Sequence, residues 1–187
     1  MKKILLLVAV LFVGTSLFAQ DVQFGAKGGL NFANWIGDDA DGTDMRTDIH
    51  LGAFARFAIN ENIAFQPELV YSRQGMKVDI NGSDVKFKSN YLNIPLLMRA
   101  KMADKFHAIL GPQVGIHLNS EADDGDVSVD ADNMKGLDLA LALGLEYDVA
   151  DNVAIGLRYN WGLSKVVDVD DAKVQNSVIQ LGVSVAF

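Results

Sequence analysis

The sequence predicts an all-β fold, in which eight antiparallel strands follow one another around an up-and-down barrel. Three observations predict it. Apolar residues recur at every second position in eight separate segments, and this is the period of an extended strand. The connections between these segments alternate between short and long. The aromatic residues of the segments gather near the two ends of the segments, as they do where a barrel meets two interfaces.

Each of the eight segments has one face that carries no charge. In chain order they are residues 22–32, 51–59, 63–71, 92–100, 106–116, 139–147, 153–161 and 179–187. The sixth segment shows the pattern most clearly, because Leu139, Leu141, Leu143 and Leu145 alternate with two alanines, a glycine and a glutamate. We therefore interpret all eight segments as strands rather than helices.

The opposite faces carry polar and charged side chains, and parity alone does not say which face is inside. The charged residues include Arg56, Glu68, Arg99, Glu146 and Arg158. The short connections are residues 60–62, 101–105 and 148–152, and the long ones are 33–48, 76–91, 118–137 and 162–176. All short turns thus lie at one end of the barrel. This asymmetry is typical of outer-membrane barrels, which have tight periplasmic turns and longer extracellular loops.

The aromatic residues form two belts, one near each end of the predicted barrel. The belt near the short turns contains Phe24, Phe57, Phe65, Phe106, Tyr147 and Phe187, and the belt near the long loops contains Phe32, Tyr71, Tyr159 and Trp161. Strands of about ten residues, tilted by about 40–45°, span roughly 25 Å, which is the apolar height of such barrels. We therefore expect the uncharged faces to contact lipid in the outer membrane of a Gram-negative cell envelope. The termini would be periplasmic and the long loops extracellular.

The first residues have the form of a secretory signal peptide. A basic start at residues 1–3 is followed by an apolar stretch at residues 4–13 and by a small residue, Ala19. We place the signal peptide at residues 1–19 and the barrel domain at residues 20–187, with cleavage after Gln20 as the alternative. An N-terminal membrane anchor is the competing interpretation, but the apolar stretch is short for it.

Composition excludes several classes of function. The chain has 187 residues, with 24 Asp and Glu against 16 Lys and Arg, a net charge of −8. This acidic balance argues against a nucleic-acid partner, which requires a basic surface. The absence of cysteine excludes disulfides, thiolate metal sites, a cysteine nucleophile and a lipid-anchored N-terminal cysteine.

The inward charges are expected to fill the lumen as a polar network. Eight strands leave an interior that side chains can fill, and Arg56, Glu68, Arg99, Glu146 and Arg158 are large enough to do so. The hairpin register places Arg56 diagonal to Glu68, so we predict an ion pair between them. A plugged lumen favours a structural or surface-interaction role. The alternatives are a narrow pore for small solutes, a soluble secreted barrel that binds an apolar ligand, and a lipid-modifying barrel enzyme.

Candidate chemistry is sparse, and we expect neither enzymatic activity nor a cofactor. His50, His107 and His117 lie on different strands, too far apart for a three-histidine metal site. Ser72 lies opposite His50 and near Glu68, which is the only constellation that suggests a hydrolase. Weak candidates for calcium ligands are three acidic residues in the first long connection: Asp39, Asp41 and Asp44. The acidic loops would otherwise be solvated, or would meet an unknown extracellular ligand.

Several short motifs make the chain resemble the PorT-type, porin-like family of outer-membrane β-barrels. They are residues 66–69 (QPEL) with Tyr71-Ser72, residues 91–97 (YLNIPLL), residues 111–115 (GPQVG) and residues 158–163 (RYNWGL). The resemblance implies an eight-stranded outer-membrane barrel with no assigned activity for most members, and one branch is linked to protein secretion. The terminal Phe187 also resembles the signal by which the barrel-assembly machinery recognises a final strand. Outer-membrane lipid and that machinery are the partners this implies.

Overall fold

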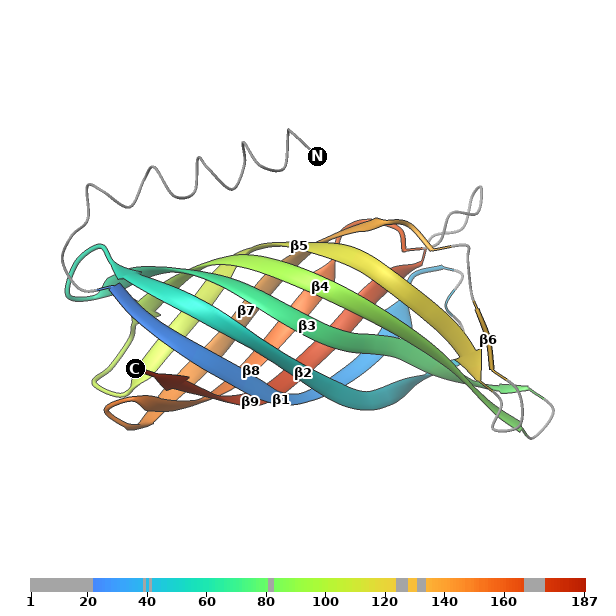
Figure 1. The fold of residues 1–187 in the computed structure, drawn as a ribbon, viewed down its shortest axis with the longest axis horizontal. Helices are drawn as coiled ribbons and strands as arrows, with labels where there is room; N and C mark the ends of the chain where they lie inside the picture. The colour runs from blue at the N-terminus through green and yellow to red at the C-terminus, as the bar shows by residue number, and fades with distance from the viewer. Residues whose placement is uncertain are drawn as a thin grey trace.

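The computed structural model is a closed barrel of tilted strands (Figure 1). It describes residues 22–38, 40, 42–80, 83–123, 128–130, 134–166 and 174–187, so the predicted signal peptide lies outside the described residues. The strands are β1 (Val22–Ile36), β2 (Thr43–Ala58), β3 (Ile63–Ile80), β4 (Ser83–Lys101), β5 (Phe106–Asp123), β6 (Ser128–Asp130), β7 (Leu137–Ala150), β8 (Val153–Gly162) and β9 (Gln175–Ala186). No described segment forms a helix long and apolar enough to cross a membrane.

Eight of these strands form the barrel, and all neighbours in it are antiparallel. The ladder runs β4-β3-β2-β1-β9-β8-β7-β5 and is closed by pairing of β4 with β5. The short β6 pairs only with the outer end of β5. Closure matters in lipid, because an open sheet edge would leave backbone amides and carbonyls without partners. The predicted eight-stranded up-and-down barrel is therefore confirmed.

A two-residue turn at residues 81–82 predicts that Tyr71 pairs with Leu92 and Phe65 with Met98, and the loop at 60–62 predicts that Phe57 opposes Phe65. Both registers are confirmed. Tyr71 pairs with Leu92 and Phe65 with Met98 across β3 and β4. Phe65 also pairs with Phe57 across β2 and β3. Because side chains alternate with period two, the apolar residues of neighbouring strands then share one face.

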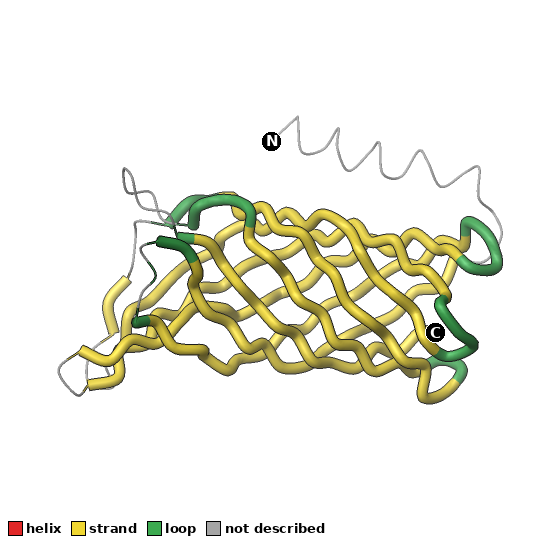
Figure 2. The backbone as a smooth tube through the Cα atoms, turned by 180° about the vertical axis from the view of Figure 1, so that it is seen from behind, coloured by secondary structure: helices red, strands yellow, loops and turns green. Residues whose placement is uncertain are grey.

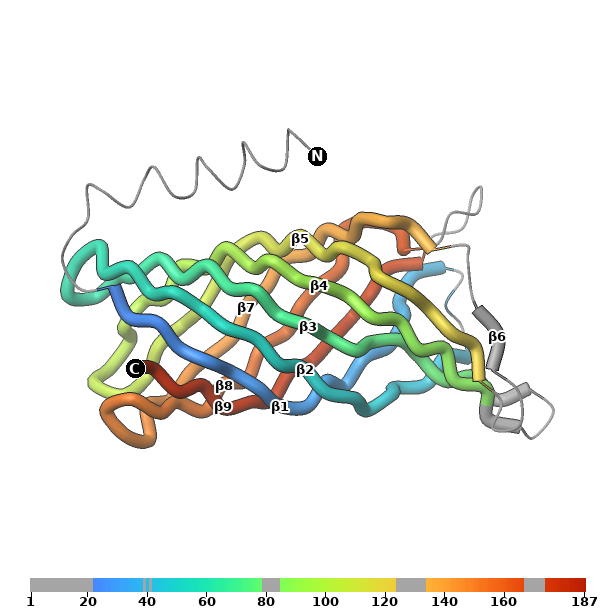
Figure 3. The backbone as a smooth tube through the Cα atoms, viewed as in Figure 1, coloured from blue at the N-terminus to red at the C-terminus, as the bar shows by residue number. Residues whose placement is uncertain are grey.

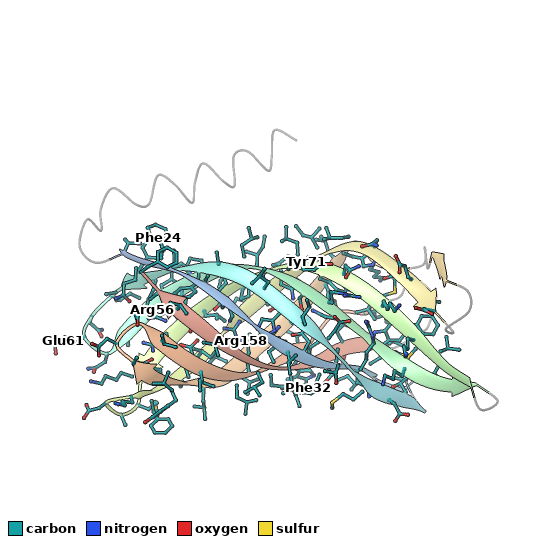
Figure 4. All side chains as sticks on the ribbon, turned by 60° about the horizontal axis from the view of Figure 1, so that its bottom comes forward. Phe24, Phe32, Arg56, Glu61, Tyr71 and Arg158 are labelled. Atoms are coloured by element: carbon teal, nitrogen blue, oxygen red, sulfur yellow. The ribbon has the colours of Figure 1, made fainter. Side chains whose placement is uncertain are left out.

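The apolar face points outward and the charged face points into the lumen. Leu145 and Leu157, on β7 and β8, are 56% and 54% exposed, whereas Glu68 and Arg158 are 4% and 3% exposed. Figure 4 shows Arg56 and Arg158 inside the barrel and Phe24 and Tyr71 outside it, toward opposite ends. A soluble barrel would have the reverse arrangement, because water rather than lipid would surround it.

The strands extend well beyond the segments recognised in the sequence, and the long connections are correspondingly shorter. β3 has 18 residues and β4 has 19, and only residues 37–42 separate β1 from β2. Much of the expected loops 33–48 and 76–91 is thus paired strand, and we correct those loop boundaries. Outside the lipid the outer face need not be apolar, so the alternation that reveals a strand fades while backbone pairing continues.

The two ends of the barrel differ (Figure 2). The three short turns, at residues 59–62, 102–105 and 151–152, lie at the same end as the C-terminus. The extended parts of β2 to β5 lie at the other end (Figure 3). There β6 pairs with the end of β5. Phe106 and Tyr147 form part of the belt at the turn end, with ring centroids 4.8 Å apart.

Candidate functional site in the barrel lumen

Glu68 lies in the lumen and is the shared partner of two cations. Strand parity points it inward from β3, and it accepts two hydrogen bonds from the Arg158 guanidinium on β8, both 2.8 Å long. The Lys27 ammonium on β1 lies 3.0 Å from the same carboxylate. A fork of two parallel N–H···O bonds is the strongest geometry available to an arginine and a carboxylate. The bridge therefore ties together strands that are 90 residues apart in the chain.

A second cluster surrounds Glu146 nearer the turn end. The Arg99 guanidinium donates to the Glu146 carboxylate at 2.8 Å, and Arg56 lies 3.9 Å from it. Gln66 connects the two clusters, because it accepts from Arg56 Nε at 2.8 Å and donates to Glu68 at 2.9 Å. The network thus contains all five residues that the sequence placed in the lumen.

The predicted ion pair between Arg56 and Glu68 is wrong. Both side chains point into the lumen, but the carboxylate that Arg56 approaches is Glu146, and Glu68 pairs with Arg158 and Lys27. Sequence parity fixes the side of the sheet on which a residue lies. It does not show how far a long side chain reaches across a narrow lumen, and here the opposite wall supplies the partner.

The Ser72 constellation is not arranged for catalysis. His50 Nδ1 lies 2.9 Å from Asn31 Oδ1, and Asn31 Nδ2 donates to Ser72 Oγ at 2.9 Å. Asn31 therefore stands between the histidine and the serine, and the structure shows no hydrogen bond joining those two among its described residues. Glu68 is engaged by the cations named above. Ser72 and His50 are both buried, so this polar group fills space and satisfies its own donors and acceptors.

The other two histidines also have ordinary structural partners. His107 lies 2.9 Å from Arg99 near the turn end, and His117 lies 2.6 Å from Ser120 on the outer extension of β5. Burial lowers the pKa of the His117 ring. Within the described residues no three His, Cys, Asp or Glu side chains gather as a metal site. Asp39 and Asp41 lie outside the described residues, and Asp44 is exposed.

An apolar cluster also lies inside the barrel, and sequence reasoning missed it. Leu97, Ile109 and Ala142 meet inside the lumen from β4, β5 and β7. These three residues occupy inward positions of their strands. In the sequence, the charged residues of the same face dominate the pattern, so the apolar residues among them do not stand out. Beside the charged network a cavity of about 20 Å³ remains, which is the size of one water molecule or small ion.

The outer end carries further ion pairs and a wider cleft. Asp48 pairs with Arg46 and lies 3.3 Å from Arg73, and Lys88 pairs with Asp123. The pair of Asp48 with Arg73 joins β2 to β3, and the pair of Lys88 with Asp123 joins β4 to β5. A cleft of about 420 Å³ opens between the β1–β2 and β8–β9 connections, with lining residues Gly37, Asp38, Leu163, Lys165 and Gln175.

A closed eight-stranded barrel with an apolar outside and an ion-paired inside is an outer-membrane β-barrel protein. The chain belongs to the family described as "Outer membrane protein beta-barrel domain", whose model matches residues 18–168. No significant match was found among curated proteins. The family places the protein in the outer membrane.

Solved structures show the same fold at low sequence identity. Neisserial surface protein A is 19% identical with a TM-score of 0.58, and the match covers 90% of this chain and 100% of that one. Ail, the attachment invasion locus protein of Yersinia pestis, is 16% identical with a TM-score of 0.54 and the same coverage of both chains. At these identities the likeness is one of architecture alone.

Proposed function

We propose that this protein is a plugged, non-conducting outer-membrane barrel whose role is structural or in surface interactions. The observation that carries the proposal is the bidentate bridge between Arg158 and Glu68, which crosses the lumen with both partners almost completely buried. A charged bridge in a lumen this narrow leaves no continuous water path. Contact with a macromolecular partner then takes place on the outside of the barrel.

The extended parts of β2 to β5 are the surface best placed for such contacts. They project past the aromatic belt at Tyr71, and cross-strand ion pairs such as Lys88 with Asp123 fix their shape. A paired sheet presents a rigid surface, so a partner would bind it at lower entropic cost than a free loop. In this proposal these extensions are extracellular, the termini are periplasmic, and acidic residues of the same end face the medium.

Two further proposals concern export and membrane insertion. We propose that residues 1–19 direct export and are removed, with Gln20 as the alternative last residue. We also propose that the barrel-assembly machinery reads Phe187, which is exposed beyond the end of β9. The PorT-type resemblance stays a prediction and adds no activity to this proposal.

The alternatives fit the geometry less well. A soluble carrier of an apolar ligand would need an apolar interior, and this lumen is lined mainly by charges and amides. A lipid-modifying enzyme would need its serine and histidine open to substrate, and Ser72 and His50 are buried. A narrow pore would need more space than the small cavity at the level of Lys27 and Arg158 offers among the described residues.

Planar-bilayer conductance tests the plugged state. The purified barrel should give no stepwise current, whereas a variant with Glu68→Ala and Arg158→Ala should conduct, because the bridge and much of its volume are gone. Regular current steps from the unmodified protein would overturn the proposal in favour of a pore. Glu61→Ala, in an exposed turn, is the control variant. Prepared in the same detergent, it reports any leak that the detergent alone causes in the bilayer.

Epitope insertion tests the orientation. A tag placed between β3 and β4, at residues 81–82, should react with antibody on intact cells. The same tag in the turn at residues 60–62 should react only after the outer membrane is permeabilised. Reversed accessibility of the two tags would contradict extracellular extensions.

A further inference from the structure

We propose that the lumen binds one small monovalent anion, of the size of chloride or bromide, between Lys27, His50 and Arg158. The site is the cavity of about 20 Å³ whose wall these three residues form with Gly156, Gln180 and Ser184. A cavity needs about 10–15 Å³ by this measure to hold one water molecule, so a halide ion can enter while a polyatomic anion such as gluconate is too large.

One residue in the wall of this cavity has a hydrogen-bond donor without a partner. The two terminal nitrogens of Arg158 donate to Glu68, but its Nε is buried and has no partner among the described residues. The Lys27 ammonium has three N–H groups, and both bonds it makes go to the Glu68 carboxylate. At least one of its donors therefore remains for another acceptor. Buried donors are rarely left without an acceptor.

The charge of the surroundings selects an anion over a cation or a neutral molecule. Lys27 and Arg158 share one carboxylate, Glu68, and both lie at the cavity. Glu146 also lines the cavity, but its carboxylate is bonded to Arg99 at 2.8 Å and faces Arg56 at 3.9 Å. The four cations of the central lumen thus face two carboxylates.

Two other carboxylates lie toward the ends of the lumen and already have partners. Asp148 bonds to Arg99 at the turn end. Asp138 accepts from Asn176 and Ser164 at the outer end. Neither lines the cavity. A bound halide would accept from the remaining Lys27 N–H and add a negative charge beside Lys27 and Arg158.

Thermal unfolding in two salts tests the site. The refolded barrel in detergent is titrated with sodium chloride or sodium bromide against sodium gluconate at equal ionic strength. We expect Tm to rise and saturate with each halide and to stay flat with gluconate, because a ligand that binds only the folded state raises its stability. An equal rise in all three salts would mean general screening and would overturn the proposal.

Two variants remove the site in different ways. Lys27→Met removes a cation, and its halide-dependent shift in Tm should disappear. Gly156→Ala keeps every charge but places a methyl group in the cavity, where the new Cβ would lie 3.5 Å from the Glu146 Cγ in ordinary contact. This variant should fold and also lose the halide shift. Lys101→Met, an exposed lysine at the turn end, is the matched control and should keep it.

Diffraction from crystals grown in bromide locates the ion directly. An anomalous peak in the cavity beside Arg158 Nε is the expected result, and it should be absent from crystals of Gly156→Ala. A bromide-grown crystal of the unmodified protein without that peak would show that the cavity holds water, and the proposal would be wrong.

Discussion

Substitution of Glu68 by glutamine probes the energetics of the lumen most directly. Glutamine has nearly the same shape as glutamate but carries no charge, so the change leaves Arg158 and Lys27 buried without their counter-charge. Removing one partner of a buried ion pair costs about 3–5 kcal/mol, because the remaining charge is uncompensated. Here two cations lose the same partner, at 2.8 and 3.0 Å. We therefore expect the free energy of unfolding to fall by an amount near the upper end of that range.

The assay is urea unfolding of the barrel in lipid vesicles, followed by tryptophan fluorescence and by the gel shift between unheated and boiled samples. Glu61→Gln, in the exposed turn between β2 and β3, is the control and should change stability by less than about 0.5 kcal/mol. Adding Arg158→Met to Glu68→Gln should recover part of the loss, since one orphaned charge is then gone. A loss for Glu68→Gln no larger than that of the control would refute the reasoning.

Three further outcomes follow from the geometry. Gly75→Ala should destabilise the β3–β4 extension, because φ is +129° and the new Cβ would lie 1.9 Å from a carbonyl oxygen of β4. Gly42→Ala has φ +78° but open space around the new Cβ, so it should lower stability less. Amide hydrogen exchange measures both effects. Leu143→Arg on the lipid face should cost about 2–4 kcal/mol in vesicle unfolding, and Leu163→Arg at the outer end about 0–1 kcal/mol. Deletion of Phe187 should lower the amount of folded barrel in the outer membrane, measured by the gel shift of membrane fractions, and unchanged amounts would rule out its role as a signal.

Most of the barrel could be predicted from the sequence, because lipid imposes a rule that acts on each residue separately. Every outward residue in the membrane must be apolar, so the period-two pattern of segments such as 139–147 survives without interruption. Register then follows from short turns, and the pair Tyr71 with Leu92 could be derived by counting back from residues 81–82. The requirement for apolar outward residues applies only to the part of the barrel that contacts lipid. The period-two pattern therefore does not mark the outer half of β3, which contains Lys77.

The sequence predicted which charged residues face the lumen, but not which of them form ion pairs. Inward parity identified Arg56, Glu68 and Glu146, but which cation meets which carboxylate depends on the tilt of the strands and on the lengths of side chains that cross the barrel. Neighbours in sequence register were therefore the wrong partners. The cavity beside Arg158 depends on the same geometry, since it exists only where small residues such as Gly156 face long ones. No sequence pattern encodes such a space.

The ion pairs of the lumen also explain why the membrane-spanning part and the outer part of this chain can have different roles. The bridge from Glu68 to Arg158 and Lys27 joins β3, β8 and β1, so closure of the barrel is supported by side chains as well as by the backbone ladder. We therefore expect substitutions in the outer connections to cost the barrel less stability than loss of this bridge. Cross-strand pairs such as Asp48 with Arg73 would still join the bases of the extensions. In the proposed function, contacts on the outside need no opening of the lumen, and a change in the extensions should alter surface contacts without altering the ion pairs of the lumen.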